Sequence, residues 1–259
     1  MAPLKYKRFI FTVTTGRSGS NFLTEILACL KDTCSVHEPR PRFDKVMRMT
    51  QGYPIIAEEF LSKKKIPAIG KRLKNKSIYV ESSHLFCKGF LEPWLRIDEV
   101  PVPDLICLDR DLRKISRSLF QIGTTPGRTW HGLKYYLAPN DPDNLTLIEG
   151  HDSLHDYQMC YWYCLEIEAR KKHYKALIEK HGGKCVHTSI DELKTMDGIE
   201  AVREKLSLPA FSFFGKQRYQ RIINKVINPK SKEKNRLDIT EEQIVGWEKE
   251  LEDKIIYKS

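Results

Sequence analysis

The segment from residue 14 to residue 21 constrains this chain more than any other. It reads Thr-Thr-Gly-Arg-Ser-Gly-Ser-Asn and follows an apolar run, Phe9–Val13, that is typical of a buried strand. Residues 22–27 after it have the apolar spacing of a helix. In a strand–loop–helix of this kind, backbone N–H groups and the helix N-terminus converge on an anion. The segment therefore predicts a phosphate-binding loop, the alternative being a glycine turn that only caps a helix.

The residue types within this loop suit an anion. Two glycines let the backbone approach a ligand closely, hydroxyl and amide side chains add hydrogen-bond donors, and one arginine adds positive charge. The expected anion-binding residues are Thr15, Gly16, Arg17, Ser18, Gly19, Ser20 and Asn21. The loop is not a Walker A motif, which needs a Lys and a Mg²⁺-binding hydroxyl after its last glycine. ATP with Mg²⁺ is therefore disfavoured.

Short β-branched or aromatic runs alternate with helical stretches along the chain. We expect strands at 9–13, 33–36, 77–80, 105–108 and 184–187. We expect helices at 21–30, 55–64, 85–95, 111–121, 154–179, 198–206 and 241–254. This alternation predicts an α/β fold, in which a mostly parallel central sheet is flanked by helices, as a single domain over 1–259. Residues 123–150, rich in Gly and Pro, are expected to be an irregular insert and a candidate substrate lid.

The composition narrows the class of ligand. The formal net charge of +10 favours an anionic partner, and residues 213–236 carry eight Lys or Arg against one acid. Seven scattered cysteines fit reduced core thiols, and no metal site is expected from their spacing. No stretch approaches 18 consecutive apolar residues, and residues 1–8 lack the apolar region of a secretory signal. We therefore expect a cytoplasmic protein with no membrane span.

A second motif lies in residues 106–120. Arg110 follows an expected strand directly, and Ser118 stands eight residues later, about two helical turns on. In doubly wound sheets ligands bind at the carboxyl ends of the strands, so we expect Arg110 to reach an anion beside the first loop. This would be a second phosphate site. An ordinary solvated helix start is the alternative for this segment.

Together the two motifs resemble the sulfotransferase family, whose members use 3'-phosphoadenosine 5'-phosphosulfate (PAPS). The family loop reads Ser or Thr, any residue, Pro or Gly, Arg or Lys, Ser, Gly, then Ser or Thr, and residues 14–20 match it. The family's Arg, followed eight residues later by Ser, matches Arg110 and Ser118. Residues 161–174 look like the family's long helix. Residues 186–193 look like its strand and Tyr-Glu-Asp-Leu-like turn, with Ile190 in place of Tyr.

The resemblance implies a P-loop-like fold and transfer of the sulfonyl group of PAPS to a hydroxyl or amine of a small-molecule acceptor. PAP (3'-phosphoadenosine 5'-phosphate) would be the product, with no metal required and no nucleic acid as partner. It further implies that Arg17 is the leaving-group cation and that Phe22 stacks on adenine. Residues 213–236 would close the 3'-phosphate site, with Lys230 and Lys232 as candidates.

Sulfonyl transfer also needs a base for the acceptor proton. Glu38 follows the second expected strand and resembles the Glu that serves as base in several branches of the family. His84 follows the third strand and resembles the His of a Lys-Thr-His-Leu segment, with Ser82 standing where that Lys would be. We favour Glu38 over His84 and keep Glu81 as a third candidate. The alternative role for each is that of a surface or capping residue.

Two other functions are compatible with these patterns. One is a P-loop-like phosphotransferase that uses an ordinary nucleotide. The other is a non-catalytic, basic polyanion-binding protein, in which aromatic side chains would interleave with the cations. The acceptor and the oligomeric state are left open.

Overall fold

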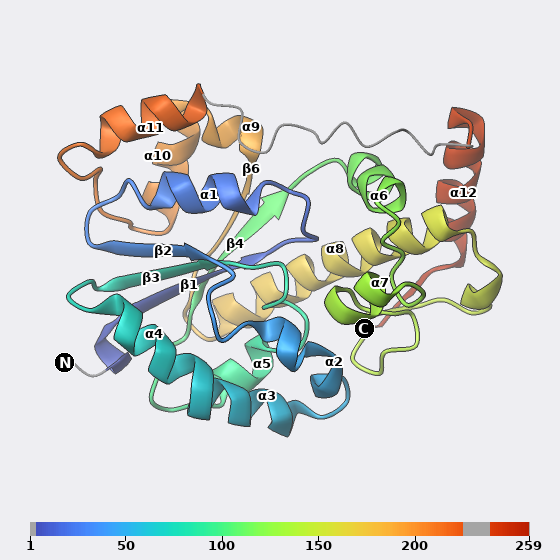
Figure 1. Ribbon diagram of the computed structural model, residues 1–259, viewed down its shortest axis with the longest axis horizontal. Coiled ribbons are helices and arrows are strands. Elements are labelled where there is room, and N and C mark those ends of the chain that lie inside the picture. Colours follow the sequence, from blue (N-terminus) through green and yellow to red (C-terminus); the bar gives the residue numbers. More distant parts are fainter. Residues whose placement is uncertain (1–3, 225–238, 259) are drawn as a thin grey trace.

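A five-stranded parallel sheet forms the centre of the protein, as the computed structural model shows for residues 4–224 and 239–258 (Figure 1). Its strand order is β2-β3-β1-β4-β6. The strands are β1 (Arg8–Val13), β2 (Thr33–His37), β3 (Ile78–Ser82), β4 (Asp104–Asp109) and β6 (Cys185–Ser189). β1 lies in the middle, where Ile10 pairs with Val80 of β3 and Asp104 of β4. The predicted α/β class with a mostly parallel sheet is confirmed.

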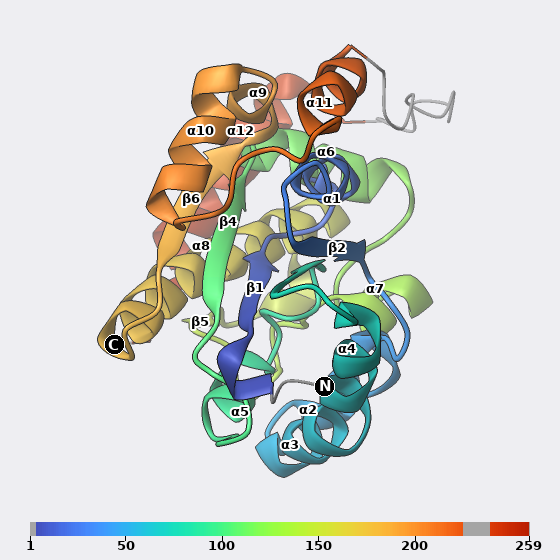
Figure 2. The ribbon, with the colours of Figure 1, turned by 90° about the vertical axis from the view of Figure 1, so that its left-hand side faces the viewer.

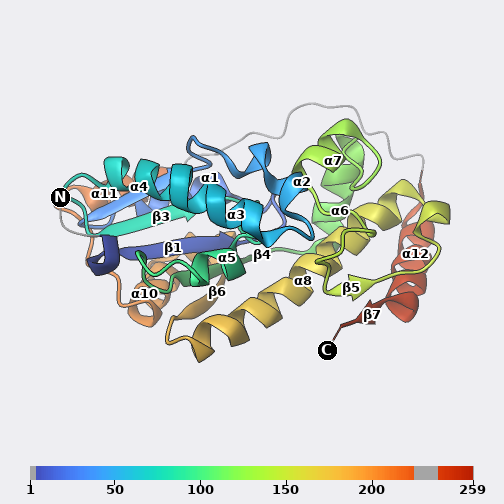
Figure 3. The same cartoon turned by 90° about the horizontal axis from the view of Figure 1, so that it is seen from below.

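Helices cover both faces of this sheet (Figures 1 and 2). On one face lie α1 (Ser20–Leu27), α9 (Ile190–Leu193), α10 (Met196–Lys205) and α11 (Gly215–Ile223). The opposite face packs against α2 (Met47–Thr50), α3 (Pro54–Phe60), α4 (Ile66–Leu73), α5 (Leu91–Leu95), α6 (Leu112–Gln121) and α8 (Asp156–Lys180). Figure 3 shows the long helix α8 running toward α12 (Glu241–Lys254), which packs against it.

The remaining elements are short. They are the 3₁₀ turns η1 (Leu4–Tyr6), η2 (Phe43–Lys45) and η4 (His151–Ser153), the π-helical turn η3 (Leu61–Lys65), helix α7 (Trp130–Tyr135), and an antiparallel pair, β5 (Thr146–Leu147) with β7 (Ile256–Tyr257). No helix within the described ranges is long and apolar enough to cross a membrane.

Side-chain alternation along β1 explains the two-sided core. Ile10 faces α1, whereas Phe9 and Phe11 face the opposite layer, because successive side chains of a strand point to opposite faces. The Phe11 ring stacks on Phe86 at a centroid distance of 3.9 Å. Both faces of β1 are therefore buried, as expected for the central strand of a parallel sheet.

Three expectations about local structure need correction. The helix expected at 85–95 covers only Leu91–Leu95, because the chain turns through Gly89 at a φ of 97°. The helix expected at 55–64 continues as α3, η3 and α4 to Leu73. The segment 123–150 is largely irregular as predicted, but it contains α7, whose first turn is capped by the Thr129 side chain, and β5.

A buried ion pair holds the end of this segment against helix α8. Glu166 and Arg170 of α8 lie 2.7 Å apart and are almost completely buried. Glu166 accepts hydrogen bonds from the backbone N–H groups of Leu145 and Thr146, and Arg170 donates to the carbonyl of Asp143. The end of the segment is therefore anchored through its backbone. Its expected role as a lid remains a prediction.

Candidate active site

The loop predicted to bind phosphate lies between β1 and α1, at the carboxyl edge of the sheet. Gly16, Arg17 and Gly19 have positive φ angles of 79°, 57° and 88°. None of the backbone N–H groups of residues 16–19 donates a hydrogen bond within the described part of the chain. Helix α1 begins at Ser20 without a side-chain cap. The loop therefore offers a set of free donors at a helix N-terminus, as an anion requires.

The hydroxyl groups of the loop brace it from within. Thr15 Oγ1 donates to the Gly16 carbonyl at 2.8 Å and lies 2.9 Å from Ser18 Oγ, and both side chains are buried. Tyr163 of α8 donates to the Thr15 carbonyl at 2.7 Å. These contacts hold the loop in its strained conformation. The contribution of Thr15 and Ser18 is thus to shape the loop.

The second motif, Arg110 with Ser118, lies beside the loop at residues 14–21. Arg17 Nε donates to Ser118 Oγ at 3.2 Å, and the Arg110 guanidinium donates to the carbonyl of Arg17. Within the described residues neither arginine has a carboxylate within 4.0 Å. Partial desolvation of its guanidinium, followed by the nearby Arg17 charge, lowers the pKa of Arg110. Two exposed arginines therefore concentrate positive charge beside the free N–H groups of the loop.

The start of α1 makes two further contacts. Ser20 Oγ lies 3.0 Å from His37 Nε2, which links the loop to the end of β2. Ile190 packs so closely on Gly19 that an added Cβ there would lie 2.5 Å from Ile190 Cγ1. Asn21 is partly exposed in the first turn of α1. Phe22 is only 6% exposed and packs in the core under α1, so the structure lends no support to its stacking on adenine, which stays a prediction.

Glu38, the favoured base, lies directly after β2 with a φ of 41° and a partly exposed side chain. The turn that follows it is fixed by a buried lysine. Lys65 Nζ donates to the carbonyls of Pro39 and Pro41 at 3.3 and 3.1 Å, and it is paired with Glu81 of β3 at 2.7 Å. Glu81 is fully buried in this pair, which excludes it as a base that contacts the acceptor.

The second candidate base lies beside the first. His84 Nε2 is 3.6 Å from Glu38 Oε1, and its Nδ1 is 2.9 Å from the Nζ of Lys88. Burial, then the Lys88 charge, then His37 lower the pKa of His84 well below its usual range. This lowered pKa favours the neutral imidazole form of His84. The two residues, treated as alternatives in the sequence, belong to one cluster.

Lys88 is a residue of this cluster that sequence patterns did not single out. It is completely buried, and burial lowers its pKa to about 7. Its Nζ donates to the Tyr135 carbonyl and lies 4.6 and 4.9 Å from the ring centres of Tyr136 and Tyr163. The one signal in the sequence was Ser82, which stands where the similar family segment has a Lys. The position of that cation in this chain was therefore left open.

Some predicted residues are not placed here. Lys230 and Lys232 lie outside the described residues, as does most of the basic part of 213–236. Within that segment, helix α11 is anchored by Tyr219, whose buried hydroxyl donates to the carbonyls of Leu193 and Thr195. That ring is therefore not free to stack on a base.

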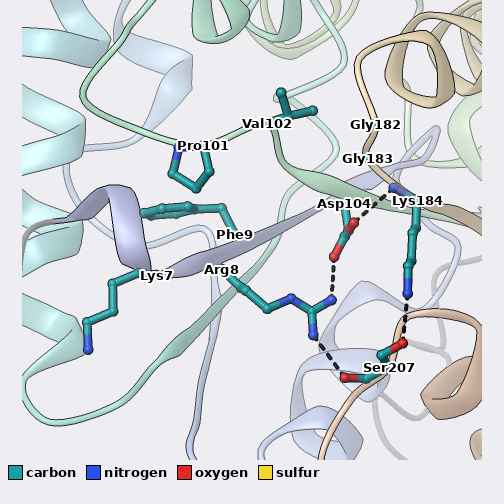
Figure 4. A pocket seen from close by; sticks show the side chains of 10 residues that line it. All are labelled: Lys7, Arg8, Phe9, Pro101, Val102, Asp104, Gly182, Gly183, Lys184 and Ser207. Atoms are coloured by element: carbon teal, nitrogen blue, oxygen red, sulfur yellow. Dashed lines mark hydrogen bonds and ion pairs between the residues drawn. The ribbon is translucent and has the colours of Figure 1, made fainter.

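A hollow of about 230 Å³ lies at the opposite edge of the sheet (Figure 4). Its lining includes Arg8 and Asp104, the first residues of β1 and β4. Three of its charged residues already have partners within the protein, since Arg8 pairs with Asp104 at 2.5 Å and Lys184 Nζ donates to Ser207 Oγ at 2.7 Å. We therefore assign the chemistry to the carboxyl edge, where the free donors and unpaired arginines lie.

One group of potential metal ligands lies outside this site. Cys107, Cys185 and His187 place one ligand atom each within 4.8 Å of one another. The two thiols are 3.6 Å apart and interact with each other, while His187 Nδ1 contacts Asp109 at 3.0 Å. Asp109 is in turn paired with Lys171 at 2.6 Å. These existing contacts give the group a structural explanation on the neighbouring strands β4 and β6.

Comparison with known proteins identifies the fold. No protein-family model matches the chain, and no curated protein sequence matches it significantly. Among solved structures it is similar to the sulfotransferase domain from the curacin biosynthetic pathway, with a TM-score of 0.52. The chain has a sulfotransferase-like fold. The two proteins share 14% sequence identity over 83% of this chain and 79% of that domain, and at this identity the likeness concerns the fold alone.

Proposed function

We propose that this protein is a PAPS-dependent sulfotransferase that acts on a hydroxyl or amine of a small-molecule acceptor. The observation that carries the proposal is the juxtaposition of Arg17, Arg110 and Ser118 beside a loop with free N–H groups. Like charges repel at such a distance, so the arrangement is best stabilised by a multiply charged anion. A donor with phosphate groups at both ends of its ribose meets that requirement.

The donor set fits the two ends of such a nucleotide. The N–H groups of residues 16–19 and the start of α1 would hold the 5'-phosphosulfate, where Gly16 and Gly19 allow close approach. Arg110 and Ser118 would hold the 3'-phosphate. Lys230 and Lys232 are proposed as further cations at that end. When bound, PAPS supplies the sulfonyl group.

The chain's own residues would carry out the remaining tasks. Arg17 stabilises the charge that develops on the leaving phosphate oxygen, and it acts electrostatically because a guanidinium does not give up its proton. Glu38 accepts the proton of the acceptor group. The acceptor would lie between Glu38 and the loop, near Tyr136, whose ring centre is 5.4 Å from that of His84.

Titration calorimetry with PAP tests this proposal. We expect the wild type to bind PAP far more tightly than ADP or AMP, which lack the 3'-phosphate. Arg110→Ala should weaken PAP binding by roughly 10- to 150-fold, since a hydrogen bond to a charged group is worth about 1.5–3 kcal/mol. Arg96→Ala is the matched control, because Arg96 pairs with Glu58 away from the site.

Other outcomes would point to the alternative functions. Equal binding of ADP and PAP would favour a phosphotransferase that uses an ordinary nucleotide. Failure to bind any of these nucleotides, together with salt-sensitive binding of an oligonucleotide, would favour a polyanion-binding protein. Either result would overturn the proposed use of PAPS.

A further inference from the structure

The imidazole of His84 is contacted at both nitrogens by groups of opposite charge. Nδ1 lies 2.9 Å from Lys88 Nζ, and Nε2 lies 3.6 Å from Glu38 Oε1. Lys88 is completely buried, so its Nζ is not exposed at the surface of the protein. No carboxylate among the described residues lies within 4.0 Å of its Nζ. A buried cation of this kind must be satisfied by other acceptors.

The acceptors of Lys88 are the Tyr135 carbonyl and His84 Nδ1. In its protonated form Lys88 has three donors and no acceptor, so the short contact between Nζ and Nδ1 then requires Nδ1 to be the acceptor. A neutral imidazole that accepts at Nδ1 carries its proton on Nε2. The second nitrogen of His84 is therefore a donor, and the nearest carboxylate oxygen to it belongs to Glu38.

We propose that Lys88 holds His84 in the Nε2–H tautomer, so that His84 donates toward Glu38 and Glu38 takes up the proton of the acceptor. Lys88 is then a positioning residue, and His84 orients the base. The tautomer of His84 is a property of the free protein, whereas the assignment of Glu38 as the base rests on the proposed sulfotransferase function.

The proton and electron balance of the step is complete. The acceptor oxygen or nitrogen forms a bond to the sulfur of PAPS, and the bond from that sulfur to the 5'-phosphate oxygen breaks. The electron pair of the broken bond leaves with PAP. The acceptor proton passes to the carboxylate of Glu38, and His84 keeps its Nε2 proton throughout.

The surroundings of His84 favour this assignment. Among the described residues, the titratable groups near the His84 ring are Lys88 on its own segment, His37 and Glu38 at the end of β2, and Tyr136 after α7. His37 Nε2 is engaged with Ser20 Oγ. Within the described residues, the carboxylate of Glu38 is thus the acceptor group that lies nearest to Nε2 of His84, at 3.6 Å.

Nitrogen-15 NMR of the histidine rings tests the tautomer in the free protein, with His84→Gln used to assign the signal. In the wild type, at a pH just below 7, we expect His84 to show one protonated nitrogen at Nε2 and an unprotonated Nδ1. Lys88→Met should shift population toward the Nδ1–H form, and Lys88→Arg should restore the wild-type pattern. Lys63→Met, which removes an exposed lysine, is the matched control.

A wild-type His84 protonated at Nδ1, or doubly protonated, would overturn the proposal. This result does not depend on the folding of any variant at Lys88. The NMR test of the His84 tautomer is also independent of the test of PAPS use, because a protein that fails to bind PAP can still show the Nε2–H tautomer. In that case the proposed function fails while the tautomer assignment holds.

The second part of the proposal is that Glu38 is the base. It is tested by measuring turnover with an acceptor that the wild type sulfates. Glutamine at position 84 keeps a donor near Nε2 but cannot act as a base. His84→Gln should therefore retain more turnover than His84→Ala, whereas Glu38→Gln should lose about a hundredfold or more. If His84→Gln is as inactive as His84→Ala while Glu38→Gln remains active, His84 is the base and the proposal is wrong.

Discussion

The guanidinium of Arg110 donates to the backbone carbonyl of Arg17, so two cations that are 93 residues apart in the chain lie side by side. Neither is neutralised by a carboxylate within 4.0 Å in the described parts of the chain. This contact joins the two motifs that the sequence presented separately. It also means that an anion bound between them should stabilise the fold.

The first prediction follows from that relation. PAP at one hundred times its dissociation constant should raise the free energy of unfolding by about 2.7 kcal/mol, because only the folded protein binds it. The same concentration should stabilise Arg110→Ala much less. Urea denaturation with and without PAP measures both effects. An equal gain in the two proteins would show that Arg110 takes no part in binding.

The second prediction concerns Gly19, where backbone conformation and packing both exclude a side chain. Gly19→Ala should destabilise the protein by about 1–3 kcal/mol, because the residue has a φ of 88° and its Cβ would meet Ile190. It should also weaken PAP binding. Gly246→Ala is the control, since a Cβ there meets nothing within 4 Å.

A second substitution separates the two causes at Gly19. Ile190→Ala removes the Cγ1 and Cδ1 atoms that lie 2.5 and 2.7 Å from the added Cβ. The double variant Gly19→Ala/Ile190→Ala should therefore lose less stability than the sum of the two single variants. Simple additivity in urea denaturation would show that the contact with Ile190 contributes nothing.

The third prediction concerns the buried pair that fixes the turn after Glu38. Lys65→Met should cost about 3–5 kcal/mol of stability, because it leaves Glu81 buried without its cation. Lys65→Met/Glu81→Gln should cost less than the single change, since no uncompensated charge remains. Lys63→Met, which breaks an exposed pair with Glu59, should change stability by about 1 kcal/mol or less. If Lys65→Met and Lys65→Met/Glu81→Gln were equally stable, this account of the buried pair would be wrong.

The fourth prediction concerns the pH dependence of stability that arises from Lys88. Burial lowers its pKa from 10.5 to about 7 on folding. Between these values the unfolded chain binds a proton that the folded protein does not, so the wild type loses stability as the pH falls. The free energy of unfolding, relative to Lys88→Met, should therefore decrease from pH 10.5 to pH 7 and then level off. A constant difference would show that Lys88 keeps its ordinary pKa.

Much of the fold was predictable because it depends on local patterns. The runs at 9–13 and 105–108 are apolar and β-branched, and they form the buried centre of the parallel sheet. The helix expected at 154–179 forms as Asp156–Lys180. The segment 85–95 was predicted wrongly because its apolar spacing is helical while Gly89 turns the chain.

The sequence by itself determined the class of the fold and the position of two motifs, the loop at residues 14–21 and Arg110 with Ser118, since each follows a strand of a parallel sheet. Only the tertiary structure decided which residues surround the candidate base. Lys88 lies four positions from His84 in a segment without helix, and Glu38 comes from another strand. Such contacts depend on how separate segments pack, and the burial that lowers the pKa of Lys88 and His84 exists only after that packing is complete.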